Sequence, residues 1–108
     1  MLFKVTKSYP WYANIVNFMV AGHVPPGENK RKLIYENRLH IWDESYLFRV
    51  YSNVLLRRCV PVEEGIKIIE RCHSSLYGGH YGAFRTHSKI WHSGFFWPTI
   101  YEDTKDFI

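Results

Sequence analysis

Hydrophobic residues early in the chain recur at the three- and four-residue spacing of an α-helix. The positions are Trp11, Ile15, Phe18 and Met19. Pro10 suits the first helical position, where a missing N–H costs no hydrogen bond, and Gly22 favours a helix end. We therefore predict a first helix between Pro10 and Gly22.

A connection and a second helix are predicted next. Residues 24–27 are Val-Pro-Pro-Gly, a segment that cannot continue a helix. From Glu28 to His40 the apolar spacing is helical again. The apolar members are Leu33, Ile34 and Leu39. Because both apolar stripes are narrow, we expect residues 1–42 to form a helical leader that is not stable alone, with the basic run 30–32 in solvent.

Two runs rich in aromatic and β-branched residues, 46–51 and 54–59, follow the leader. The Ser-Asn pair at 52–53 separates them, and Asn tolerates the positive φ that a tight turn requires. This spacing predicts a β-hairpin over residues 46–59 with a two-residue loop. The pairs expected from that loop are Val50 with Leu55 and Phe48 with Arg57.

A further helix is predicted from Pro61, because Glu63 and Glu64 in its first turn meet the positive end of the helix dipole. Residues that step by four, three and four positions share one face of this helix. They are Val62, Ile66, Ile69 and His73. His73 is therefore expected to point inward with the isoleucines.

Glycines divide the rest of the chain into short segments. Gly78 and Gly79 end the helix, His80 follows, and a helical run extends from Gly82 to Ser93. Gly94 ends that run before an apolar plug and a last helix. The plug is Phe95, Phe96 and Trp97, and the last helix starts at Pro98 with Ile100, Thr104 and Ile108 on one face.

These elements predict a mainly α fold with a β-hairpin, in which a small three-helix domain over residues 43–108, including the hairpin, follows the leader. The chain has 108 residues, room for one compact domain and a short leader. Its most apolar segment, 15–22, is too short to cross a bilayer. We therefore expect a soluble, intracellular protein with no membrane contact, whose Cys59 and Cys72 are free thiols by default.

His73 and His80 are the candidate metal ligands. A histidine at a helix end and another after a glycine turn can bring their ring nitrogens to within roughly 3–4 Å, as tetrahedral zinc requires. The pattern then predicts half of a zinc site. The same spacing is also typical of one core and one surface histidine. An improvised set that adds Cys59 and Cys72 remains an alternative to two inert thiols.

A group of motifs around these histidines resembles a known domain. They are His73, Gly78-Gly79-His80-Tyr81-Gly82, Arg85-Thr86 and Gly94-Phe95-Phe96-Trp97-Pro98. Together they resemble the His-His-Cys-Cys integrase zinc-binding domain of gypsy-type LTR retrotransposon polyproteins. Residues 10–13, 42–43 and 56–60 are similar to the stretch that links ribonuclease H to integrase there, so the leader is identified as linker-like.

The resemblance implies a function and its partners. In the family, zinc is held by two histidines and a Cys-x-x-Cys pair, which comes a few residues after the position of Ile108. The domain here is therefore expected to be truncated before that pair, with zinc as the cofactor of a half-site. The family's domain helps assemble integrase on element DNA ends for DNA integration. DNA, integrase protomers or the polyprotein are the implied partners, and the nucleus is the implied location if the chain acts as integrase.

Basic residues are the candidates for nucleic-acid contact. The formal net charge is +4, which favours phosphate contacts that are weak and indifferent to sequence. Those best placed are Arg57, Arg58, Arg85 and Lys89. The carboxylates offer no acid pair, and Glu102 and Asp103 are expected to face water, so no enzyme is predicted. The alternative is a structural or interaction remnant of a decayed retroelement, with no retained metal or DNA binding.

Overall fold

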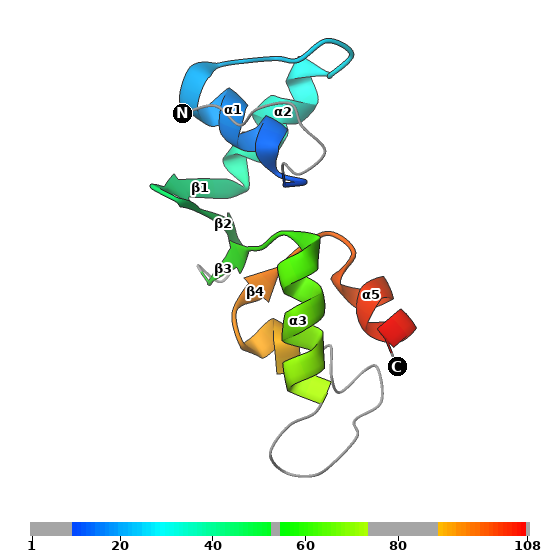
Figure 1. The fold of residues 1–108 in the computed structure, drawn as a ribbon. Helices are drawn as coiled ribbons and strands as arrows, with labels where there is room; N and C mark the ends of the chain where they lie inside the picture. Colours follow the sequence, from blue (N-terminus) through cyan, green and yellow to red (C-terminus); the bar gives the residue numbers. More distant parts are fainter. Residues whose placement is uncertain (1–9, 53–54, 74–88, 108) are drawn as a thin grey trace. The chain divides into compact units, whose positions relative to one another are not determined.

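The computed structural model describes residues 10–52, 55–73 and 89–107. They belong to two compact units that divide after Cys59 (Figure 1). Among the described residues, unit 1 holds two helices and three strands, and unit 2 holds two longer helices, the helical residues 89–92 and a short strand. The described chain is therefore a mixture of helix and sheet, and the predicted mainly α class with one hairpin understated its strand content.

Helix α1 (Ala13–Ala21) begins three residues after Pro10 and ends where predicted. Gly22 adopts a φ of 67°, and its N–H donates to the Phe18 carbonyl at 2.8 Å. This is a left-handed helix end that glycine accepts without steric cost. The predicted apolar stripe is only half-buried, because α1 packs on α2 through a neighbouring face. That face consists of Ala13, Val16 and Asn17.

Helix α2 (Lys30–Arg38) is shorter at both ends than predicted. Asn29 precedes it and accepts the Arg31 N–H at 2.9 Å, a side-chain cap that fixes the start. Leu33 is its single buried residue, whereas Ile34 is 38% exposed. The connection turns at Gly27, whose φ of 84° suits the position after Pro26 in a tight turn.

Three antiparallel strands complete unit 1: β1 (His40–Asp43), β2 (Tyr46–Val50) and β3 (Leu56–Cys59). Strand β1 was not predicted, because its first residue was assigned to the preceding helix. The β2–β3 hairpin is confirmed, but its predicted register was wrong by one residue. The observed pairs are Phe48 with Arg58, Arg49 with Arg57, and Val50 with Leu56.

The register follows from the length of the connection. Tyr51 donates its N–H to the Leu55 carbonyl at 3.0 Å, so three residues rather than two separate the paired positions. A slip of one residue sends every side chain of a strand to the other face. Arg57 therefore shares its face with Leu47 and Cys59, and all three are buried.

Unit 2 is built from α3 (Val62–His73), β4 (Phe95–Phe96) and α5 (Ile100–Phe107). Residues 89–92 are helical, and a turn at residues 93–94 follows them. Gly94 in this turn has a φ of 90°. Helix α3 packs against α5. The start of α3 agrees with prediction, since the Pro61 carbonyl accepts the Gly65 N–H. The last helix is present but begins at Ile100 rather than at Pro98, and it buries two of its predicted inner residues.

The buried face of α3 differs from the predicted stripe. It consists of Gly65, Ile68 and Ile69, whereas Ile66 is 36% exposed. The reason is Trp97, which is 0% exposed and packs directly on Gly65. A Cβ at that glycine would lie 2.6 Å from the indole ring, so only glycine admits this approach. Trp97 is therefore the centre of the unit 2 core.

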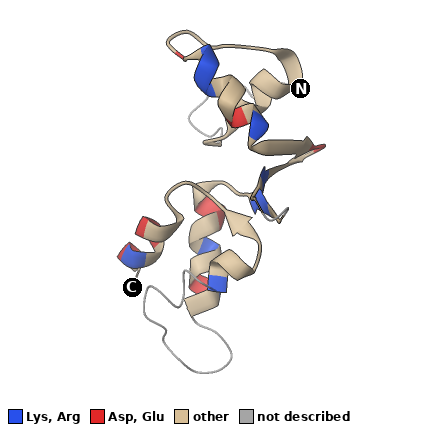
Figure 2. Ribbon diagram, turned by 180° about the vertical axis from the view of Figure 1, so that it is seen from behind, with Lys and Arg blue, Asp and Glu red and all other residues tan. Residues whose placement is uncertain are grey.

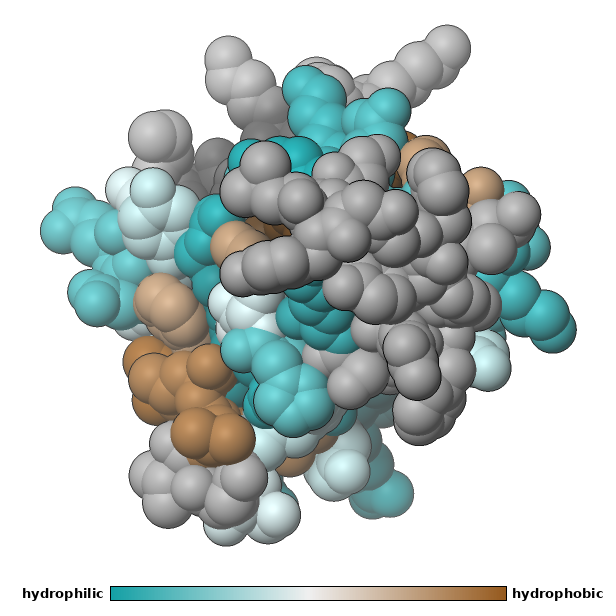
Figure 3. All heavy atoms as spheres, turned by 90° about the horizontal axis from the view of Figure 1, so that it is seen from below, coloured by the Kyte–Doolittle hydropathy of each residue, from teal (hydrophilic) through white to brown (hydrophobic). Residues whose placement is uncertain are grey.

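The exposed side chains of the described chain include both hydrophilic residues and large apolar residues. Figure 3 shows one face, on which hydrophilic side chains predominate and apolar side chains gather in a compact patch. Among the described residues no helix has the length and apolar character needed to span a bilayer.

Candidate functional site

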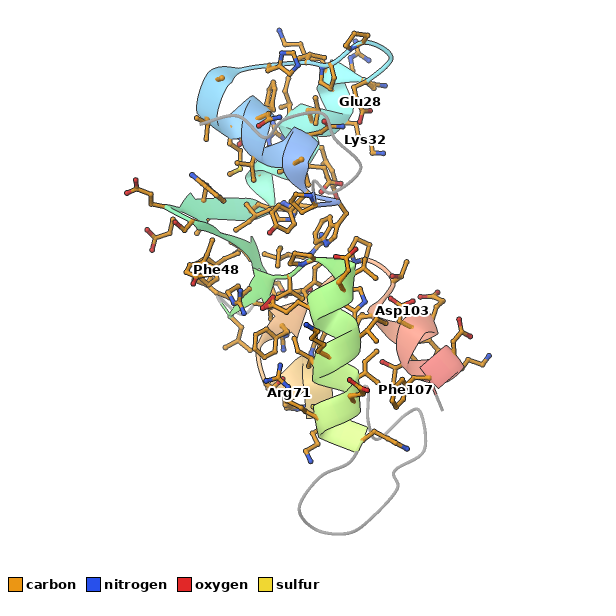
Figure 4. All side chains as sticks on the ribbon, in the orientation of Figure 1. Glu28, Lys32, Phe48, Arg71, Asp103 and Phe107 are labelled. Atoms are coloured by element: carbon orange, nitrogen blue, oxygen red, sulfur yellow. The ribbon has the colours of Figure 1, made fainter. Side chains whose placement is uncertain are left out.

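His73 is the last residue of α3, and its ring lies against α5. The ring centroids of His73 and Phe107 are 5.7 Å apart, and the rings are nearly perpendicular at 80°. The Nδ1 atom of His73 is buried. Figure 4 shows Phe107 on the side of α5 that faces α3. The histidine thus sits where the ends of the two helices meet.

The second predicted ligand, His80, lies outside the described residues, as do the Gly78-Gly79 pair and Arg85. The predicted approach of the two histidines therefore stays a prediction. Of the other histidines, His92 is exposed, as expected for a solvated helix residue. His40 is buried in unit 1, and its Nδ1 lies 2.7 Å from the Glu36 carbonyl.

Trp97 and the first turn of α5 are joined by a polar cluster that the sequence did not predict. The indole N–H of Trp97 donates to the Asp103 carboxylate at 2.8 Å, and the Thr99 hydroxyl donates to the same oxygen at 2.7 Å. Asp103 is therefore half-buried, and the prediction that it faces water was wrong. The carboxylate satisfies a buried N–H that would otherwise cost free energy. A threonine just before a helix, with an aspartate four residues on, was the available signal.

The two cysteines do not form a metal group in the described part of the chain. Both are free thiols, Cys59 in unit 1 and Cys72 in unit 2. Burial raises the pKa of the Cys59 thiol to about 12, and burial also raises the pKa of Cys72. Zinc binds the thiolate, which these surroundings disfavour. Within residues 10–52, 55–73 and 89–107 no three metal-binding side chains come together.

The predicted nucleic-acid residues differ in accessibility. Arg57 is only 6% exposed, and its guanidinium lies 4.8 Å from the centre of the Tyr51 ring. Arg58 is half-buried and lies 5.0 Å from the Tyr46 ring, whereas Lys89 is exposed. Each guanidinium over a ring gains a cation–π contact. Because Arg57 is buried, it presents little surface to a phosphate, and the expected surface position of its side chain was wrong.

Comparison with protein families gives one match. Residues 60–108 match the family model described as integrase zinc binding domain. No curated protein and no solved structure matches the chain. The matched segment begins at Val60, where unit 2 also begins, and it contains both His73 and Trp97. Residues 60–108 of this chain are therefore similar to the integrase zinc-binding domain.

Proposed function

We propose that residues 60–108 act as the zinc-binding module of a retrotransposon integrase of the gypsy type, with His73 and His80 as the nitrogen ligands. The observation that carries this proposal is the contact between His73 and Phe107. It joins the end of α3, which holds one ligand, to the end of α5. In the family that the sequence resembles, the Cys-x-x-Cys pair follows this last helix.

The donor chemistry fits zinc. Structural zinc is four-coordinate, with bonds of about 2.0–2.1 Å to histidine nitrogen and about 2.3 Å to cysteine sulfur, so ligands from separate segments must converge. His73 is half-buried beside an aromatic ring, which shields a metal–imidazole bond from water. Gly78 and Gly79 permit the sharp return that His80 needs. Cys59 and Cys72 do not enter this ligand set.

Zinc in this position would tie α3 to α5 and contribute directly to folding. The role that we propose for residues 60–108 is therefore to bind zinc and to hold a folded structure together. We propose that the folded module helps to assemble integrase on element DNA ends, with other integrase protomers or the polyprotein as partners. Contacts to phosphates are assigned to Arg58, Arg85 and Lys89, because the Arg57 side chain is only 6% exposed.

Zinc content decides the first part of this proposal. The test uses a polypeptide that continues past Ile108 through a Cys-x-x-Cys pair, dialysed against trace zinc and analysed by elemental mass spectrometry. The parent is expected to retain about one zinc per chain, as a closed four-ligand site does. His73→Asn should lose most of it, because three ligands leave the site open.

The matched control is His92→Asn, which removes an exposed histidine from the same unit. It should keep the zinc content of the parent. Equal zinc in His73→Asn and the parent would rule out His73 as a ligand. A parent without zinc would favour the alternative, a structural remnant of a decayed element.

A further inference from the structure

Helix α2 carries a face whose side chains are exposed. Arg31, Ile34, Tyr35 and Arg38 line a shallow depression on it. Their spacing of three, four and seven residues places them on one side of the helix. Tyr35 is 60% exposed, although the opposite side of the helix is buried through Leu33. We call these four residues the α2 basic face.

Helix α2 carries a large excess of positive charge. Cations occur at Lys30, Arg31, Lys32 and Arg38, and Glu36 is the single carboxylate of α2. Figure 2 shows the helix blue at its start and at its end, with one short red stretch.

The nearby carboxylates are directed elsewhere. Glu36 approaches the His40 ring at 3.9 Å, and Glu28 accepts from the Asn14 amide at 2.9 Å. In the part of the chain that the structure describes, no carboxylate forms an ion pair with Arg31 or Arg38. Two guanidinium groups and an aromatic ring are thus left pointing to solvent.

We propose that the α2 basic face binds single-stranded nucleic acid, with Arg31 and Arg38 on phosphates and Tyr35 stacked on a base. The two arginines are seven residues apart, a rise of about 10 Å along the helix. The tyrosine lies between them, so a base can stack there while the flanking phosphates meet the guanidinium groups. Aromatic stacking with flanking cations is the usual way proteins hold single strands without regard to sequence.

The tyrosine decides between single strands and other anionic partners. A duplex keeps its bases stacked inside, so it offers this face phosphates alone. An acidic protein segment would pair with the arginines but has no base for Tyr35. The α2 basic face lies in unit 1, outside the segment that matches the zinc-binding family, so the inference does not rest on zinc.

Fluorescence anisotropy of the whole chain with labelled oligothymidylate and oligouridylate of about 12 nucleotides, within the usual site size, tests the proposal. Tyr35→Leu should weaken binding about five- to a hundred-fold, as loss of one stacking contact does. Tyr35→Phe keeps the ring and should bind like the parent. Arg31→Gln with Arg38→Gln should lower the slope of log affinity against log salt by about 1.4, since each lost phosphate contact removes about 0.7.

The matched control removes the same charge from exposed positions of α3, as Lys67→Gln with Arg71→Gln. It should leave affinity and salt slope near those of the parent. The proposal is overturned if the control weakens binding as much as the α2 pair, or if Tyr35→Leu binds like Tyr35→Phe. It is also overturned if duplex DNA or polyglutamate binds as tightly as the single strands. Tighter binding of one oligonucleotide identifies DNA or RNA as the preferred strand, and equal binding means that the α2 basic face accepts both.

Discussion

Replacing Gly65 by alanine tests how the core of unit 2 is built. In an ordinary helix this change stabilises, because alanine has the higher helix propensity by about 1 kcal/mol. Here the added Cβ would lie 2.6, 2.7 and 2.8 Å from three atoms of the Trp97 indole. Ordinary contact begins at 3.4 Å, so the ring or the helix must move.

Movement of the Trp97 ring is opposed by its surroundings. Trp97 is fully buried, and its N–H is held at 2.8 Å by the Asp103 carboxylate. Overpacking a core costs about 1–3 kcal/mol, and a hydrogen bond to a charged acceptor is worth about 1.5–3 kcal/mol. If the clash also breaks that hydrogen bond, subtraction of the propensity gain leaves an expected loss of about 1.5–5 kcal/mol in the free energy of unfolding for Gly65→Ala.

Urea denaturation gives the change in the free energy of unfolding, and hydrogen exchange of the α3 and α5 amides assigns it to unit 2. Lys67→Ala, on the exposed side of α3, is the control and should stay within about 0.5 kcal/mol of the parent. In a Trp97→Leu background the clash is relieved, so Gly65→Ala should become neutral or stabilising. Stabilisation by Gly65→Ala in the parent itself would refute the packing argument.

Three further predictions follow from buried polar groups. Asp103→Ala removes the acceptor of two side-chain donors and should lower the free energy of unfolding by about 1–3 kcal/mol in a urea titration, whereas exposed Asp106→Ala should not. Near pH 8, iodoacetamide should label Cys72 well before Cys59, whose pKa is raised to about 12; equal labelling in peptide mass spectra would contradict this. Burial lowers the pKa of His40 from 6.5, so the unfolded chain binds the proton more readily and stability should fall as pH drops below about 6.5. Melting curves from pH 7.5 to pH 5 should therefore show a steeper decline for the parent than for His40→Gln.

The hairpin shows what a sequence pattern can and cannot predict. Two strand-like runs were enough to predict β2 and β3, because aromatic and β-branched residues suit a pleated surface. The loop length was not determined by the Ser-Asn pair at 52–53, and the register moved by one residue. That shift placed Arg57 in the interior, where Tyr51 stacks on its guanidinium. Turn geometry, rather than strand propensity, therefore decides which arginine is accessible.

Helix α3 shows a different limit. Its start was predictable from Pro61 and the acidic first turn. Its buried face was not, because the central contact is made at Gly65, a residue with no side chain to mark it as apolar. The hydrophobic spacing predicted that Ile66 lies in the core. In the structure Ile66 is exposed, because Trp97 packs on the side of α3 that carries Gly65. Because glycine has no side chain, an analysis of apolar spacing does not identify a glycine as a core position.

The plug and the candidate zinc ligand are connected through α3. Near the start of α3 the Trp97 ring packs on Gly65, and at the end of α3 the His73 ring contacts Phe107. The two contacts are eight residues apart, a rise of about 12 Å, and both are made with the segment that contains α5. The angle between α3 and α5 is therefore fixed at two points, one of which is the candidate ligand. A change at Gly65 that tilts α3 should displace His73 from Phe107, so in a zinc-binding form of the chain Gly65→Ala should weaken metal affinity without touching a ligand.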